Sequence, residues 1–336
     1  MHLKGNMTMC MLLLILLSLL MGLSSLSWMG YWISLELNTI AFLGMVCILS
    51  GSNYSGGMKY FMVQSSCSFL LIFSTFSAEL ASSDVWALLV LFSLMVKVGA
   101  SPFHMWVPLV SGELEWAGNI ILLTLQKIIP MALLCLLYNS SMESIYILIG
   151  GLSCIVGGVS GWGELSLRKL MSFSSINHVG WMVVCSMMGE GVWTIYFIVY
   201  SLLSLGVMSL MKIVDVWNMN DLWESGESGL RFSLSMLLLS LSGIPPMTGF
   251  YPKWVVLEAS YSVGLGPMVL FMLVASIVLM SFYLRLVLFS LTFHSKGLVK
   301  SKFYLWGPIS LLSTLGWAGL EAFGLLSSSL QHMLLL

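Results

Sequence analysis

The sequence predicts an all-α polytopic membrane protein with about eleven transmembrane helices. Of its 336 residues 59% are hydrophobic and only 8% are charged, which is far more apolar than a typical soluble domain. Apolar runs of about 20 residues, the length that crosses a bilayer, follow one another with short loops between them. Because the chain has no long polar block, we expect residues 1–336 to form a single membrane domain.

The apolar runs, separated by polar, Pro and Gly signals, predict the position of each helix in turn. The predicted helices are residues 8–26, 28–50, 58–77, 85–108, 116–137, 143–162, 168–188, 191–213, 231–262, 266–291 and 304–325. The first run lacks a small-residue cleavage site and further spans follow at once, so we interpret it as a helix rather than a signal peptide.

Pro and Gly interrupt the fourth, fifth and ninth helices, and we expect the fourth (85–108) and ninth (231–262) to be broken. Lys97 precedes the break at Pro102, whereas Lys253 follows the break at Pro245. The two helices are an odd number of spans apart, so they cross the membrane in opposite directions. This mirrored arrangement predicts an inverted repeat, which is typical of ion-handling membrane proteins. The alternative is that the prolines merely kink two packed helices.

The repeat prediction also divides the chain. We expect a first helix repeat over residues 1–137 (helices 1–5), a second over 138–291 (helices 6–10), and a C-terminal loop with helix 11 over 292–336.

The loop charges predict the orientation, because Lys and Arg gather on the side that is not translocated. On the N-terminal side lie Lys4, Lys59, Arg168, Lys169, Lys212, Arg231, Arg285, Lys296, Lys300 and Lys302. The opposite loops contain no Lys or Arg and carry Glu79, Asp84, Glu143 and Glu190. We therefore expect the N-terminus to face the compartment of synthesis and the C-terminus to face the opposite one.

Four ionisable residues lie inside the apolar runs: Glu36, Lys97, Lys127 and Lys253. A charge at the bilayer centre costs at least about 2.5–3.5 kcal/mol, so such residues are candidates for a functional site. Glu36 lies two turns into its helix, about 12 Å below the start. At that depth we expect it to be protonated or paired, and Lys97 and Lys127 are the available cations.

Buried lysines of this kind suit a proton relay. Removing an ammonium group from water favours its neutral form, and a nearby carboxylate favours its charged form. Moving the carboxylate therefore changes whether the lysine holds its proton, and groups coupled in this way can pass protons along a hydrated path. The alternative is a static Glu–Lys pair that only fixes packing.

Two histidines are further candidates. His178 lies within helix 7 near Ser174, Ser175 and Asn177, and His104 follows the break in helix 4. Imidazole titrates in the range that suits proton transfer. A hydrogen-bonded packing role is equally consistent with both positions.

Several classes of function are disfavoured. The six cysteines form no C-x-x-C pair and have no histidine at ligand spacing, so we expect no metal site. The net charge of −1 and the lack of a basic and aromatic cluster argue against a nucleic-acid partner. There is no P-loop, and no G-x-G-x-x-G that follows a strand, so we expect no nucleotide or flavin on this chain.

Motifs along most of the chain carry a family resemblance. They are Leu35-Glu36-Leu37-Asn38, the stretch from Lys97 to Pro108, Gln126-Lys127, Leu167-Arg168-Lys169-Leu170, the stretch from Ser174 to Trp181, the stretch from Gly243 to Phe250 with Lys253-Trp254, and the stretch from Phe282 to Leu286. The chain resembles the family of subunit 2 of mitochondrial NADH dehydrogenase, an antiporter-like proton-pumping subunit of respiratory complex I. The first helix and the loops 51–57 and 215–230 show no clear match.

The resemblance implies a core membrane-arm subunit with a matrix N-terminus, which moves protons across the inner mitochondrial membrane. It implies that Glu36 and Lys97 are the interacting pair of one half-channel, that Lys127 is the connecting lysine, and that Lys253 is the distal lysine of the other half-channel. FMN, iron–sulfur clusters and ubiquinone are expected on other subunits, with no cofactor on this chain. The implied partners are other membrane-arm subunits of complex I, the lipid bilayer, protons and water.

Two other functions stay open. A stand-alone cation/proton antiporter could use the same broken helices and lysines, although it would need further carboxylates for a cation site. A structural membrane scaffold could hold the same charges as frozen ion pairs.

Overall fold

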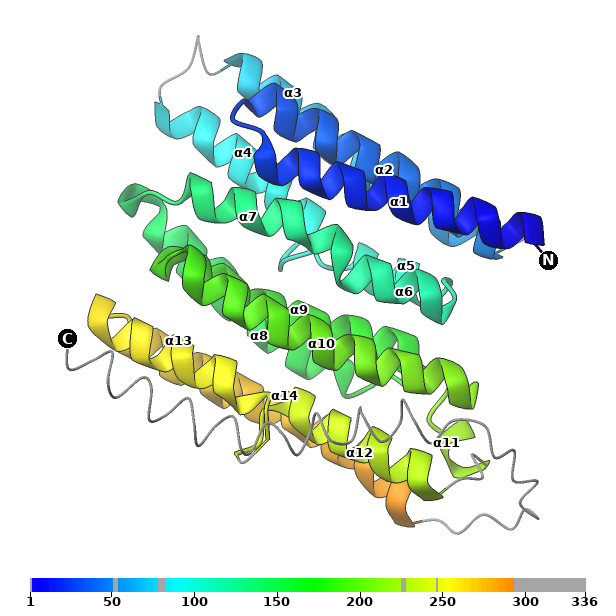
Figure 1. Ribbon diagram of the computed structural model, residues 1–336. Helices are drawn as coiled ribbons and strands as arrows, with labels where there is room; N and C mark the ends of the chain where they lie inside the picture. Colours follow the sequence, from blue (N-terminus) through cyan, green and yellow to red (C-terminus); the bar gives the residue numbers. More distant parts are fainter. Residues whose placement is uncertain (1, 51–53, 78–82, 225–227, 246, 293–336) are drawn as a thin grey trace.

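The computed structural model describes residues 2–50, 54–77, 83–224, 228–245 and 247–292, which form a bundle of α-helices (Figure 1). Within these residues there is no β-strand, and one isolated bridge joins Ser166 and Asn218. The predicted all-α fold is therefore confirmed. The helix predicted over residues 304–325 lies outside the described residues.

The ten spans predicted within the described residues are all found. They are α1 (His2–Ser24), α2 (Trp28–Ser50), α3 (Ser55–Ser77), α4 with α5 (Ser83–Val98 and Trp106–Ser111), α6 with η1 and α7 (Trp116–Leu123, Leu125–Lys127 and Ile128–Leu137), α8 (Glu143–Gly161), α9 (Leu167–Met188), α10 (Glu190–Val214), α12 with α13 (Ser228–Ser242 and Phe250–Val263) and α14 (Gly266–Thr292). Two short elements, η2 (Ser140–Met142) and α11 (Asp221–Glu224), were not predicted. The start of α1 at His2 rather than residue 8 also differs from the prediction, because its first turns are too polar for an apolar pattern to include.

By length and apolar composition, six helices among the described residues could each cross a membrane. They are Gly5–Ser24, Trp28–Ser50, Trp116–Leu137, Ser140–Gly161, Glu190–Val214 and Gly266–Ser290. The halves of the broken helices are too short to do so alone, and α3 and α9 carry many polar side chains. These remaining spans depend on their neighbours to shield their polar groups.

Helix α9 is the centre of the bundle. Nearly all of its residues are buried, and it packs against α5, α7, α8, α10 and α13. Its polar side chains therefore face protein rather than lipid. Ser174, Ser175 and Asn177 each donate a hydrogen bond to a backbone carbonyl.

The predicted interruptions are present in all three helices. Residues 99–105 separate α4 from α5, and residues 243–249 separate α12 from α13, with Gly99 (φ 77°) and Gly243 (φ 75°) directly after the first half in each case. These left-handed conformations are ones that glycine adopts without strain. In Figure 1 the two broken helices run in opposite directions on either side of the bundle. The third interruption is the short 3₁₀ turn η1, which ends at Lys127.

Basic residues meet acidic partners at one end of the bundle. Lys59 forms an ion pair with Glu113, and Lys169 lies 3.8 Å from Glu164. Burial raises the pKa of Glu113, but the hydrogen bonds from Lys59 and Ser55 and the charge of Lys59 together outweigh burial and hold that pKa below its usual value. Arg168 donates to the Leu114 carbonyl at 2.7 Å. This end is therefore rich in both signs of charge, not in basic residues alone.

Close packing of α8 on α9 generates a prediction. A Cβ atom on Gly157 would lie 2.6 Å from the Asn177 backbone nitrogen and 2.8 Å from the Phe173 carbonyl oxygen. We expect Gly157→Ala to destabilise the protein by about 1–3 kcal/mol, because the two backbones must separate. Thermal unfolding of the purified protein measures this loss.

The matched control is Gly191→Ala in α10, where a Cβ would meet nothing within 4 Å. It should leave stability unchanged or slightly raised, since alanine is the better helix former. Equal destabilisation by the two substitutions would show that close α8–α9 packing is not the cause.

Candidate functional site

Each buried lysine lies at a helix interruption. Lys97 is in the last turn of α4, Lys127 ends η1, and Lys253 is in the first turn of α13. Their exposed fractions are 5%, 4% and 2%. An interruption leaves backbone groups without helical partners, and away from water these must be satisfied by other protein groups or by enclosed water. Lysine ammonium groups can supply donors there.

Lys253 satisfies one such group directly. Its Nζ donates to the Ser242 carbonyl oxygen at 2.9 Å, at the C-terminal end of α12. The positive charge is favourable at this end of the helix. A Cβ on Gly243 would lie 2.6 Å from the Lys253 Nζ, so glycine is needed for the side chain to reach the break.

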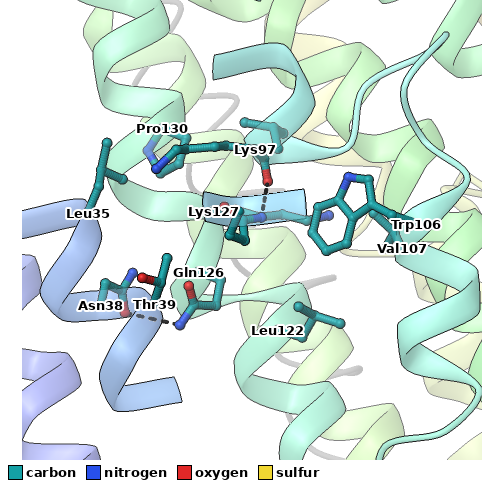
Figure 2. A pocket seen from close by; sticks show the side chains of 12 residues that line it. Leu35, Asn38, Thr39, Lys97, Trp106, Val107, Leu122, Gln126, Lys127 and Pro130 are labelled. Carbon is teal, nitrogen blue, oxygen red and sulfur yellow. Dashed lines mark hydrogen bonds between the residues drawn. The ribbon is translucent and has the colours of Figure 1, made fainter. Parts of the chain in front are cut away.

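Lys97 and Lys127 line one narrow cavity (Figure 2). It has room for roughly one water molecule. The other polar side chains in its wall are Asn38, Thr39, Gln64 and Gln126. Lys97 Nζ has no hydrogen-bond partner among the described residues, and Lys127 Nζ has only a long 3.5 Å contact with the Ser175 carbonyl oxygen. The cavity is thus small, partly polar and lined by two buried lysines.

Glu36 lies near Lys97 without touching it. The ion pairs within 4.0 Å among the described residues are the two at the end of the bundle, and neither involves Glu36. Its buried Oε1 has no hydrogen-bond partner in the part of the chain that the structure describes. The carboxylate nevertheless interacts electrostatically with Lys97 and with Tyr60. The direct ion pair that a frozen scaffold requires is therefore not formed in this structure.

On the other side of Lys127, α10 supplies two tyrosines. The Lys127 Nζ lies 5.7 Å from the centroid of the Tyr200 ring, within cation–π distance. The His178 ring lies 4.9 Å from that of Tyr200, and His178 Nδ1 is 2.9 Å from the Tyr196 hydroxyl oxygen. His178 thus lies beside Lys127 in the interior of the bundle.

The same cluster extends to Lys253. The Trp181 and Tyr196 rings are stacked, with their centroids 6.4 Å apart. Lys253 Nζ lies 5.9 Å from the Trp181 ring centroid. His178 interacts electrostatically with both Lys127 and Lys253. Sequence reasoning missed Tyr196 and Tyr200, although tyrosines four residues apart in an apolar helix share one face and could have been noticed.

The structure does not place His104 with the other candidates. It lies in the 99–105 connection, is half-buried, and is not part of the cavity wall. Its buried Nδ1 has no hydrogen-bond partner among the described residues.

Within the described residues, no three His, Cys, Asp or Glu side chains gather closely enough to hold a metal ion. All six cysteines are free thiols.

Comparison with known proteins now identifies the family. The model of the family described as NADH:quinone oxidoreductase/Mrp antiporter, transmembrane, matches residues 25–280. The chain belongs to this family. NADH-ubiquinone oxidoreductase chain 2 of Locusta migratoria is 32% identical to it over 289 residues, which are 82% of this chain and 84% of the relative. The same-named protein of Anopheles gambiae is 33% identical over 292 residues, which are 82% of this chain and 83% of the relative.

The fold of the family is also found in a solved structure. A chain of respiratory complex I from Thermus thermophilus superposes with a TM-score of 0.80 over 92% of this chain and 77% of that chain, at 21% identity. The family match covers Glu36, all three buried lysines and His178. The resemblance drawn from the sequence motifs is thereby confirmed.

Proposed function

We propose that this chain is a core membrane-arm subunit of respiratory complex I, and that it translocates protons across the inner mitochondrial membrane. Family membership and the curated relatives named NADH-ubiquinone oxidoreductase chain 2 support the assignment to that complex. The observation that carries proton translocation is the polar cavity shared by Lys97 and Lys127. Two buried lysines that line one small cavity can exchange a proton through a water molecule held between them when one side chain is an ammonium and the other a neutral amine.

The proposed mechanism begins at Glu36. A charge rearrangement arriving from a neighbouring subunit changes the distance from Glu36 to Lys97, and with it the proton affinity of Lys97. The present arrangement, in which the two interact without contact, leaves room for such a change. The altered charge of Lys97 then acts across the cavity on Lys127, because coupled groups titrate together.

The second half of the relay runs from Lys127 to Lys253. His178 interacts with both lysines and shares a hydrogen bond with Tyr196, so we assign it the intermediate position. His104 is kept as a candidate for proton exchange at the break between α4 and α5, where its Nδ1 is buried.

The redox chemistry is assigned to other subunits. We propose that NADH oxidation and ubiquinone reduction, together with FMN and the iron–sulfur clusters, reside on partner chains, so that this chain contributes to the enzyme without a cofactor of its own. Its partners would then be the other membrane-arm subunits, the lipid bilayer, and the protons and water of its interior.

Two rivals each have one observation in their favour. The family description includes Mrp antiporters, which favours a stand-alone cation/proton antiporter. The hydrogen bond from Lys253 to Ser242 favours a scaffold in which the lysine only stabilises a broken helix. The scaffold does not explain why Lys97 lines a cavity with no hydrogen-bond partner for its Nζ among the described residues. The antiporter would need further carboxylates for a cation site.

Replacing Lys97 with Met tests the relay. We expect Lys97→Met to abolish proton translocation by this subunit while the complex still assembles, because Met fills similar space but cannot carry a proton. The measurement is the proton-to-electron ratio of the purified complex in proteoliposomes. Lys127→Met and Lys253→Met should lower the ratio in the same way.

The matched control is Lys212→Met, which removes an exposed lysine at the end of α10 and should leave the ratio unchanged. An unaltered ratio in assembled complexes that carry Lys97→Met would refute the relay. Unaltered ratios for Lys127→Met and Lys253→Met would favour the scaffold.

Orientation is a separate prediction. We propose that the N-terminus lies in the matrix and the C-terminus faces the intermembrane space, since the chain's loop Lys and Arg gather on the N-terminal side. Cysteines introduced as Lys4→Cys and Leu336→Cys should react with an impermeant thiol reagent from opposite sides of the membrane. Reaction of both from one side would contradict this orientation.

A further inference from the structure

A hydrogen-bonded bridge crosses the wall of the cavity beside Lys127. The Tyr60 hydroxyl donates to Gln126 Oε1 at 3.0 Å. Gln126 Nε2 in turn donates to Asn38 Oδ1 at 3.0 Å (Figure 2). The bridge therefore joins α3 and α2 through one side-chain amide. Tyr60 and Asn38 are each 1% exposed, so the two outer members of the bridge are buried, whereas Gln126 between them is partly buried.

The outer members of the bridge are held firmly. The Tyr60 ring packs edge-on against Phe42 of α2 at 4.8 Å and lies 6.1 Å from the ring of Trp106 in α5. Breaking either hydrogen bond would leave the buried hydroxyl of Tyr60 or the buried amide oxygen of Asn38 unpaired, which is unfavourable. Gln126 is thus fixed from both sides.

Gln126, the middle residue of the bridge, lies where the helix is interrupted. At Thr124 the backbone leaves the α-helical region (φ −116°, ψ −80°), and only the three-residue turn η1 connects α6 to α7. Such a turn has few hydrogen bonds of its own to hold its side chains in place. Gln126 directly precedes Lys127 in this turn.

Asn38, at the other end, follows Glu36 by two residues on α2. Glu36 also interacts electrostatically with Tyr60. The bridge therefore links the helix that carries the carboxylate to the turn that carries the central lysine. An amide does not readily pass a proton from its oxygen to its nitrogen, so the bridge can transmit position but is unsuited to conduct protons itself.

We propose that Gln126 is a positioning residue: its amide ties the Lys127 turn to α2, so that a displacement of Glu36 also moves Lys127. This inference rests on the proposed function. It assigns a mechanical connection that bypasses Lys97, in addition to the electrostatic route through the cavity.

The test uses the intact complex in proteoliposomes. Gln126→Leu removes both hydrogen bonds at similar volume, and it should lower the proton-to-electron ratio to that of Lys127→Met and shift the pH profile of pumping. Gln126→Leu combined with Asn38→Leu should lose no more than Gln126→Leu alone, because the bridge acts as one unit. The control is Tyr146→Phe, which removes a buried hydroxyl that donates to the Leu134 carbonyl and lies outside the bridge.

An unchanged ratio and pH profile in assembled Gln126→Leu complexes would overturn the proposal, as would losses that add in the double variant. If Gln126→Leu fails to assemble, Tyr60→Phe, which deletes one hydroxyl, is judged by the same readouts. Lys127→Met distinguishes a failure of the proposed function from a failure of the positioning role alone. If it pumps normally, the proposed function fails, whereas a loss in Lys127→Met with normal pumping in Gln126→Leu overturns only the positioning role.

Discussion

Polar groups enclosed in an apolar bundle set the main constraint on this structure. Backbone amides that lose their helical partners cost several kcal/mol in lipid, so an interrupted helix is tolerated only where protein or enclosed water can satisfy it. Here all three interruptions lie beside a lysine. Lys253 satisfies one of these backbone groups directly, because its Nζ donates to the Ser242 carbonyl oxygen. The position of α9 at the centre follows from the same constraint, since its polar residues must face protein.

The candidate site differs from a set of static ion pairs in how its charges are spaced. Glu36 interacts with Lys97 at a distance, and Lys97 and Lys127 share a cavity instead of a carboxylate. Glu36, Lys97 and Lys127 do not form ion pairs with one another. A small displacement of a helix would therefore change how much of each side chain is in its charged form. Between Lys127 and Lys253 the site consists of packed aromatic rings and His178 instead of a cavity. The relay would thus combine a hydrated segment with a packed one.

The sequence was sufficient for features that depend on local chemistry. Apolar length placed ten spans, proline placed the breaks, and rarity of charge in apolar runs singled out the buried lysines. Features that depend on tertiary contact were not predictable. The separation of Glu36 from Lys97 is set by how α2 packs near α4, and the bridge through Gln126 joins residues 66 and 88 positions apart. The acidic partners Glu113 and Glu164 of the basic residues at one end of the bundle were likewise not predicted, because the rule that relates loop charge to orientation counts only Lys and Arg.

The central claim is that water in the interior connects Lys97 to Lys127. The most direct test is an experimental density map of the intact membrane arm, at a resolution that shows ordered water. The account predicts a water molecule in the cavity within hydrogen-bond distance of Lys97 Nζ, and its loss in Thr39→Leu, which fills the cavity wall, but not in Thr194→Leu on α10. A dry interior between these two lysines in the unmodified complex would contradict it.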